Sequence, residues 1–134
     1  PRRIFLITGD GELAEGSNWE AALAAAHYGL DNLIIINDKN NLQLAGPTRE
    51  IMNTDPLADK WKAFGMTVTE CQGNDMASVV ATLEGLKQEG KPNVVIANTT
   101  KGAGISFIQG RPEWHHRVPK GEEIALALEE LKDE

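Results

Sequence analysis

Short apolar runs alternate along the chain with segments in which apolar residues recur at helical spacing. The runs at residues 4–8 and 33–37 are continuous and rich in β-branched residues, so each predicts a buried strand. The runs at 66–71 and 94–97 predict two further strands. A strand, a crossover of helical length and a second strand form a βαβ unit, in which the strands are expected to run parallel.

Helices are predicted between and after these strands. Ser17 and Glu20 have the spacing of a capping box, so the first helix is expected to begin at Ser17 and to end at Gly29. Three more are predicted: one from Asp55-Pro56 to Gly65, one from Met76 to Gly90, and an amphipathic helix over 122–131. The alternation predicts an α/β domain with a mostly parallel sheet and helices on both faces.

Composition narrows the classes of partner. The formal net charge of −7 over 134 residues argues against nucleic acid, whose phosphates are bound by basic surfaces. No apolar run approaches the length of a membrane span, so no membrane partner is expected. The single cysteine, Cys71, rules out an internal disulfide and fits a reducing compartment, which predicts a cytoplasmic protein.

Polar residues follow two of the predicted strands at the point where each ends. The first strand leads into Gly9-Asp10-Gly11 and the second into a loop that contains Asn40. Ligands of open α/β sheets lie beyond the carboxyl ends of strands, and neighbouring strands are about 4.8 Å apart. Asp10 and Asn40 would therefore reach one small object between them.

Carboxylate and amide oxygens are hard ligands that suit Mg²⁺ or Ca²⁺. Mg²⁺ is usually shared between one or two protein groups and substrate phosphates, and Gly9 and Gly11 leave room for a phosphate near the backbone. Without a cation, Asp10 would repel that phosphate. A lone Gly-Asp-Gly is a common tight turn, so the prediction depends on both strand ends together.

The spacing from Gly9-Asp10-Gly11 to Asn40 resembles the thiamine diphosphate motif. The stretch "GDGELAEGSNWEAALAAAHYGLDNLIIINDKNNLQLAG" is similar to the transketolase family, above all to the N-terminal subunit of split transketolases. The similarity continues through "GPT", "TTKGAGISF" and "PEWHHRVP", so it extends over nearly the whole chain.

The resemblance implies roles for individual residues. Asp10 and Asn40 would be side-chain Mg²⁺ ligands, and Leu42 would add its main-chain carbonyl. Gly9 and Gly11 would lie at the diphosphate of thiamine diphosphate, and Leu44 would pack against the thiazolium ring. His115 would lie near the diphosphate and the reaction centre as the catalytic residue of this chain. Glu15 and Glu20 match acidic residues at the subunit interface of the family, although Glu20 is equally explained as half of a capping box.

The implied activity is transfer of a two-carbon ketol unit between sugar phosphates, as in the pentose phosphate pathway. The active site of the family lies between two chains, so a dimer or hetero-oligomer is expected. The partner would be a C-terminal transketolase subunit or domain that carries the pyrimidine-binding site. Two alternatives stay open: a non-catalytic binding module of the same fold, and a 1-deoxy-D-xylulose-5-phosphate synthase.

Three features depart from the family pattern. His116 replaces a usual glycine, and Ala103 stands where related chains often have a basic residue. The apolar run at 4–8 also begins almost at residue 1, with no preceding turn. Residues 1–134 are therefore expected to form the C-terminal portion of one thiamine diphosphate and Mg²⁺ binding domain, incomplete as an isolated enzyme.

Overall fold

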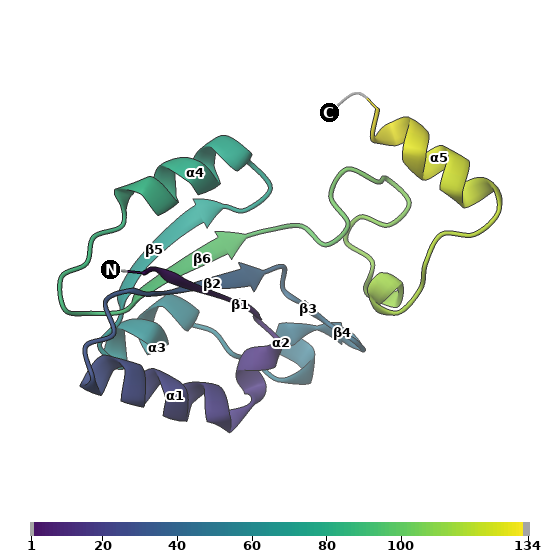
Figure 1. Ribbon diagram of the computed structural model, residues 1–134. Helices are drawn as coiled ribbons and strands as arrows, with labels where there is room; N and C mark the ends of the chain where they lie inside the picture. The colour runs from purple at the N-terminus through teal and green to yellow at the C-terminus, as the bar shows by residue number, and fades with distance from the viewer. Residues whose placement is uncertain (1, 133–134) are drawn as a thin grey trace.

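The computed structural model describes residues 2–132, and a four-stranded parallel sheet lies at its centre (Figure 1). In spatial order the strands are β1 (Ile4–Gly9), β2 (Leu33–Lys39), β6 (Asn93–Asn98) and β5 (Thr67–Gln72). The pairs β1–β2, β2–β6 and β6–β5 are all parallel, which confirms the predicted βαβ unit and the α/β class.

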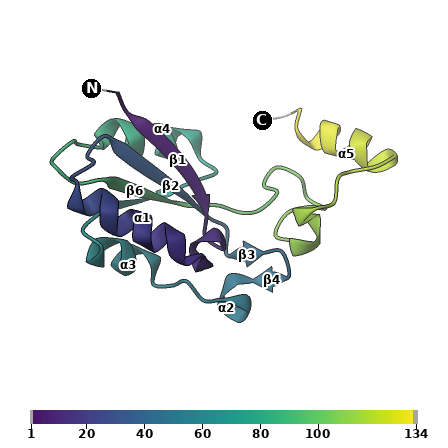
Figure 2. The same cartoon turned by 60° about the horizontal axis from the view of Figure 1, so that its bottom comes forward.

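Helices cover both faces of the sheet (Figures 1 and 2). The helices α1 (Gly16–His27) and α3 (Leu57–Ala63) lie on one face, and α4 (Met76–Gly85) lies on the other. Each face has its own apolar core. The α1 and α3 side buries Leu13, Ala22, Ala25, Ile35, Leu57, Trp61, Met66, Val94 and Ile96, and the α4 side buries Ile34, Cys71, Val95 and Ala97.

The predicted capping box at the start of α1 is wrong. The helix begins at Gly16, its N-cap is Glu15, and no side chain caps it. A 3-10 turn, η1 (Glu12–Ala14), leads directly into the helix instead. The side chains of Asn18 and Trp19 donate hydrogen bonds to main-chain carbonyls of η1, both at 2.8 Å. These bonds hold the segment that follows β1 against the first turn of α1.

The helix α4 ends earlier than predicted, at Gly85 rather than near Gly90. The loop after it has other hydrogen-bond partners, because the Asn93 side chain donates to the Lys87 carbonyl at 3.0 Å and the Gly90 N–H donates to Asp31 at 3.2 Å. Glycine is also a poor helix former, so termination at Gly85 agrees with its propensity.

The prediction that β1 is a buried strand is also wrong for this structure. Ile4, Phe5, Leu6 and Ile7 are 46–71% exposed, because β1 is the last strand on one side of the sheet. Only its carboxyl end is covered, where Thr8 is buried. The predicted buried strand β2 is confirmed, since Ile34, Ile35 and Asn37 are buried.

Three short elements after β2 were not predicted. They are β3 (Leu42–Gln43) and β4 (Gly46–Pro47), which pair antiparallel, and α2 (Thr48–Ile51). Two-residue strands leave too little periodicity for a sequence pattern to reveal them.

The chain leaves the sheet after β6 and forms an arm over residues 99–132. The arm contains a 3-10 helix, η2 (Pro112–His115), and ends in α5 (Glu122–Glu130), which lies apart from the sheet (Figure 1). The predicted final helix is thus present, but Ile124, Leu126 and Leu128 are exposed. No helix among residues 2–132 combines the length and the apolar character needed to cross a membrane.

Candidate functional site

The carboxyl ends of β1 and β2 open onto one pocket of about 510 Å³. Gly9 of β1 is in register with Asp38 of β2, so the two turns that follow the strands start level with each other. All residues predicted to bind the cofactor line this pocket. The lining consists of Gly9, Asp10, Gly11, Glu12, Asp38, Asn40, Leu42, Gln43, Leu44, Lys101 and His115.

Asp10 joins the two strand-end turns. Its carboxylate accepts the N–H of Asn41 at 2.6 Å through Oδ2 and the N–H of Gly11 at 2.8 Å through Oδ1. The residue is only 2% exposed, and burial raises the pKa of its carboxyl against the opposing effect of the two amide donors. Among residues 2–132 no lysine or arginine forms a salt bridge with it. The ionised form of a buried carboxyl that has no salt bridge would be stabilised by a bound cation.

The loop after β2 is held by its own main chain. Asn40 Oδ1 accepts the N–H of Leu42 at 2.9 Å, which keeps the Asn40 amide folded back over the turn. Asn41 has a φ of +60°, a left-handed conformation that asparagine tolerates better than most residues. Its carbonyl accepts the N–H of Thr48 at 3.0 Å, so the loop is tied to the start of α2.

The main-chain N–H groups of the two glycines that are predicted to lie at the diphosphate are hydrogen-bonded within the chain. The Gly9 N–H donates to Glu12 Oε2 at 3.0 Å, and the Gly11 N–H donates to Asp10 as described above. At Gly11 the missing side chain matters for another reason. A Cβ there would lie 2.6 Å from Gln43 Cγ, so the glycine makes room for the Gln43 side chain.

The arm supplies His115 and Lys101 to the lining of the pocket. His115 is exposed and follows the buried Trp114, whose ring lies 5.4 Å from that of Phe107 and 4.2 Å from the Arg117 guanidinium. Trp114 therefore anchors η2 and sets where His115 lies. His116, which replaces the expected glycine, packs edge-on against His115 with ring centroids 4.7 Å apart.

Four of the lining residues were not singled out from the sequence: Glu12, Asp38, Gln43 and Lys101. Asp38 is the penultimate residue of β2 and accepts a hydrogen bond from the Thr99 hydroxyl, which links β2 to the base of the arm. The strand-end rule that selected Asp10 and Asn40 also applies to Asp38. Lys101 is part of the "TTKGAGISF" stretch. Its location in the pocket could not be predicted, because it depends on the path that the arm takes after β6. It is the one lysine or arginine among the described residues that line the pocket.

Glu15 and Glu20 do not line the pocket. Both are exposed on and beside α1, so they remain available for the predicted contact with another subunit. That role stays a prediction.

The donor set of the pocket fits a hard cation that is held together with a phosphate ligand. No group of three or more His, Cys, Asp or Glu side chains within residues 2–132 is arranged to hold a metal by itself. The predicted set instead combines the Asp10 carboxylate, the Asn40 amide and a main-chain carbonyl, and Mg²⁺ commonly completes such a shell with phosphate oxygens and water.

The chain belongs to the family of transketolase thiamine diphosphate binding domains, whose model matches residues 2–132. The resemblance predicted from the strand-end motifs is thereby confirmed. Relatives point to the N-terminal subunit of split transketolases in particular. The chain is 75% identical over 133 residues to a subunit of the apulose-4-phosphate transketolase of Actinobacillus succinogenes, and the match covers 99% of this chain.

Two further relatives have the same kind of name. The chain is 40% identical over 132 residues to the corresponding apulose-4-phosphate transketolase subunit from Phocaeicola vulgatus, and 41% identical over 135 residues to "6-deoxy-6-sulfo-D-fructose transketolase subunit SqwG" of a Clostridium species. These matches cover 98% and 100% of this chain. The chain spans about half the length of the curated relatives it matches, 47–49% of each.

Solved transketolase structures have the same fold. The transketolase of Campylobacter jejuni matches with a TM-score of 0.87 and 32% identity, over 96% of this chain and 20% of that one. The Leishmania mexicana enzyme matches with a TM-score of 0.84 and 33% identity, over 95% of this chain and 19% of that one.

Proposed function

We propose that this chain anchors the Mg²⁺–diphosphate end of thiamine diphosphate in a split transketolase, an enzyme that transfers a two-carbon ketol unit between sugar phosphates. The observation that carries this proposal is the convergence of Asp10, Asn40, Leu44 and His115 on one pocket. Asp10 and Asn40 directly follow two neighbouring strands, and Leu44 follows β3. His115 comes from the arm, more than seventy residues beyond Leu44 in the sequence.

Mg²⁺ would be held by the Asp10 carboxylate, the Asn40 side-chain oxygen and the Leu42 carbonyl. The support comes from Asp10. Its side chain is buried, the pKa of its carboxyl is raised by that burial, and it forms no salt bridge among the described residues. A divalent cation would offset the unfavourable burial of this charge and would let a diphosphate approach an otherwise acidic pocket.

Two other lining residues, Leu44 and Lys101, suit a cofactor that has both a charged diphosphate and an apolar ring. Leu44 is 56% exposed although it lines the pocket, which suits a side chain that packs against a bound aromatic ring. Lys101 would neutralise charge on the diphosphate. When bound, thiamine diphosphate supplies the electron sink that cleavage of a C–C bond in a ketose requires.

His115 would act on the substrate side of the pocket. Its imidazole is exposed and is positioned by the buried Trp114, so it would be able to donate or accept a hydrogen bond at an oxygen of the bound sugar. The charge of Lys101 and the orientation of His115 are the contributions of the arm.

A second polypeptide would complete the site. The relatives are named as single subunits of their transketolases, which implies another subunit in each of those enzymes. For this chain we propose the contact at Glu15 and Glu20, two exposed residues at the start of α1 and within it. The 75% identical relative makes apulose 4-phosphate the first sugar phosphate to test.

A coupled assay with the partner polypeptide tests the proposal. The chain, in its native length, is co-purified with its C-terminal partner subunit, and ketol transfer from apulose 4-phosphate is measured with thiamine diphosphate and Mg²⁺. Turnover that requires both polypeptides and is lost in Asp10→Ala supports the assignment. Cofactor binding without turnover on any sugar phosphate would favour a non-catalytic module.

A further inference from the structure

The apolar core on the α1 and α3 side of the sheet gives way to polar residues beneath the turn that follows β1. Thr8, Asn37 and Thr54 are buried there, at 0–6% exposure. The Asn37 side chain donates to the Thr8 carbonyl at 3.3 Å and to the Thr8 hydroxyl at 3.2 Å, so side chains also join the ends of β1 and β2. Buried polar groups cost free energy that apolar side chains of the same size avoid. Their presence here therefore indicates a role beyond filling the core.

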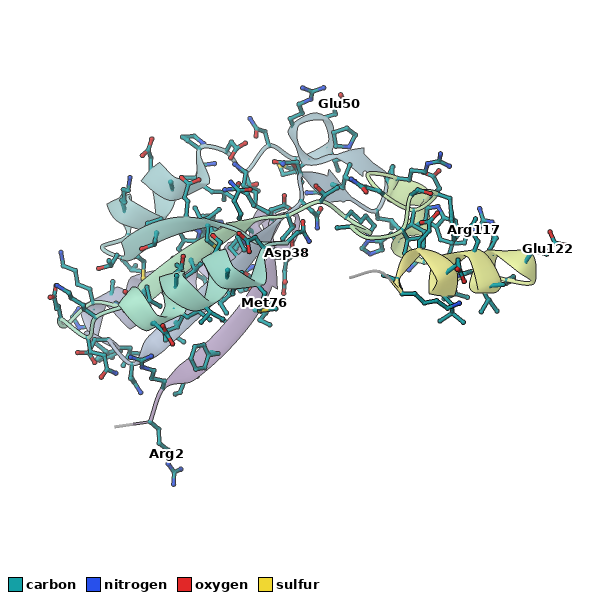
Figure 3. All side chains as sticks on the ribbon, turned by 90° about the horizontal axis from the view of Figure 1, so that it is seen from above. Arg2, Asp38, Glu50, Met76, Arg117 and Glu122 are labelled. Carbon is teal, nitrogen blue, oxygen red and sulfur yellow. The ribbon has the colours of Figure 1, made fainter. Side chains whose placement is uncertain are left out.

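Thr54 contacts Asp10 from the segment between α2 and α3. Its hydroxyl donates to the main-chain carbonyl of Asp10 at 3.4 Å, although the two residues are 44 positions apart. The Asp10 N–H donates to the Asp38 carbonyl at 3.0 Å, and Figure 3 shows Asp38 at the end of the sheet that lies toward the arm. With the bonds from Gly11 and Asn41 to its carboxylate, every polar group of Asp10 is held by another residue.

Lys60 of α3 holds Thr54 in turn. Its ammonium donates to the Thr54 carbonyl at 2.6 Å and to the carbonyl of the next residue at 3.1 Å. Lys60 forms no salt bridge among the described residues, so its charge is directed at the main chain that precedes α3. The helix is anchored in the core by Leu57 and Trp61, each 1% exposed. A series of contacts thus leads from the core through Lys60 and Thr54 to Asp10.

We propose that Thr54 and Lys60 are positioning residues that hold Asp10 in the orientation needed to bind a cation. The inference rests on the proposed function, in which the Asp10 carboxylate is a ligand of Mg²⁺. Groups that orient a metal ligand typically contribute about ten- to a hundredfold to the affinity for the metal without touching it. Valine would fill the place of Thr54 with no buried polar atom, so the bond to Asp10 explains the hydroxyl.

Two substitutions at Thr54 separate positioning from packing. Thr54→Val keeps the volume of the side chain and removes the hydroxyl, whereas Thr54→Ser keeps the hydroxyl and removes a methyl group. In the proposed complex of this chain with its partner subunit, Thr54→Val should raise the Mg²⁺ concentration for half-maximal thiamine diphosphate binding by about tenfold or more. Thr54→Ser should stay close to the wild type. Asp55→Asn, which alters the neighbouring residue of the same segment, is a second control and should also stay close to it.

The role of Lys60 is tested through Thr54. Lys60→Met keeps the apolar stem of the side chain and removes the ammonium, so it should cause a loss of the same kind as Thr54→Val. If Lys60 acts by holding Thr54, the variant that combines both substitutions should bind no worse than Thr54→Val alone.

Hydrogen exchange of the same complex without cofactor gives a readout that does not depend on binding. The main-chain N–H groups of Asp10, Gly11 and Asn41 are bonded within the two joined turns. They should exchange faster in Thr54→Val and in Lys60→Met than in the wild type, and at the wild-type rate in Thr54→Ser. Peptides from β5 should exchange alike in all variants, which checks that each variant folds.

Three results would overturn the proposal. They are wild-type Mg²⁺ dependence and exchange in Thr54→Val, an equal loss in Thr54→Ser, and additive losses from Lys60→Met and Thr54→Val. A wild-type complex that binds thiamine diphosphate equally well without Mg²⁺ would instead refute the proposed function. In that case the exchange comparison still decides whether Thr54 and Lys60 hold Asp10.

Discussion

The Asp10 carboxylate accepts the main-chain N–H of Asn41 at 2.6 Å, so the turns that follow two neighbouring strands are joined by one buried acidic side chain. This bond fixes where the adjacent side chain in the loop, Asn40, lies relative to Asp10. The proposed Mg²⁺ site depends on that relationship, and substitutions at the two adjacent asparagines test it.

Asn40→Ala should lower the affinity for thiamine diphosphate in the presence of Mg²⁺ by about ten- to a hundredfold, because an oxygen ligand is lost from the cation. Asn41→Gly is the control: it keeps the main-chain N–H that binds Asp10, and glycine tolerates the φ of +60°. Fluorescence titration of thiamine diphosphate into each variant of the proposed complex compares the two substitutions. Equal losses would show that the loop shape matters and the Asn40 side chain does not.

Gly11→Ala should destabilise the protein by about 1–3 kcal/mol through overpacking against Gln43, since the new Cβ would lie 2.6 Å from Gln43 Cγ. The backbone is not the cause, because Gly11 has ordinary right-handed angles with a φ of −67°. Urea unfolding followed by tryptophan fluorescence measures the loss. Adding Gln43→Ala should recover most of it, and a double variant as unstable as Gly11→Ala would contradict this reason.

Trp114→Ala should weaken substrate use through displacement of His115. Trp114 is buried and packs against Phe107 and Arg117, and it precedes His115 directly. Steady-state kinetics of Trp114→Ala, His115→Ala and the double variant form a cycle. If Trp114 acts by placing His115, the double variant should be no worse than His115→Ala alone. Additive losses would mean that Trp114 has a separate role.

The Lys39–Asp55 pair should make a small, pH-dependent contribution to stability. The Lys39 ammonium, 2.8 Å away, holds the pKa of the Asp55 carboxyl below its usual value of 3.8. A lowered folded-state pKa stabilises the protein above the unfolded value, and this stabilisation is lost as the pH falls through the lower folded value.

Because the Asp55 side chain is 47% exposed, Asp55→Asn should lower the free energy of unfolding at pH 7 by only about 0.5–1 kcal/mol. The difference from the wild type should shrink as the pH is lowered from 7 toward 3 in urea titrations. A difference that grows on acidification would contradict the sign of the pKa shift.

Much of the site could be predicted because its polar residues directly follow the apolar runs that mark the strands in the sequence. The apolar runs placed Gly9 and Asn40 at the ends of adjacent parallel strands, and the register of β1 and β2 confirms that placement. The start of α1 could not be predicted in this way, since Ser17 and Glu20 matched a capping pattern while a 3-10 turn supplied the entry to the helix.

Tertiary packing decided the remaining features. The location of Lys101 in the pocket follows from the path of the arm, which no periodicity encodes. The exposure of Ile7 likewise follows from the position of β1 at the edge of the sheet, because an apolar run looks the same in sequence in an edge strand and in an internal strand.

Calorimetric titration of thiamine diphosphate into the proposed complex of this chain with its partner subunit, with and without Mg²⁺, probes the proposed cation bridge between Asp10 and the diphosphate. We expect tight binding that requires Mg²⁺ in the wild type and is lost in Asp10→Asn, which keeps the shape of the side chain but removes its charge. Binding that is as tight without Mg²⁺, or unchanged in Asp10→Asn, would contradict the proposed anchoring role of this chain.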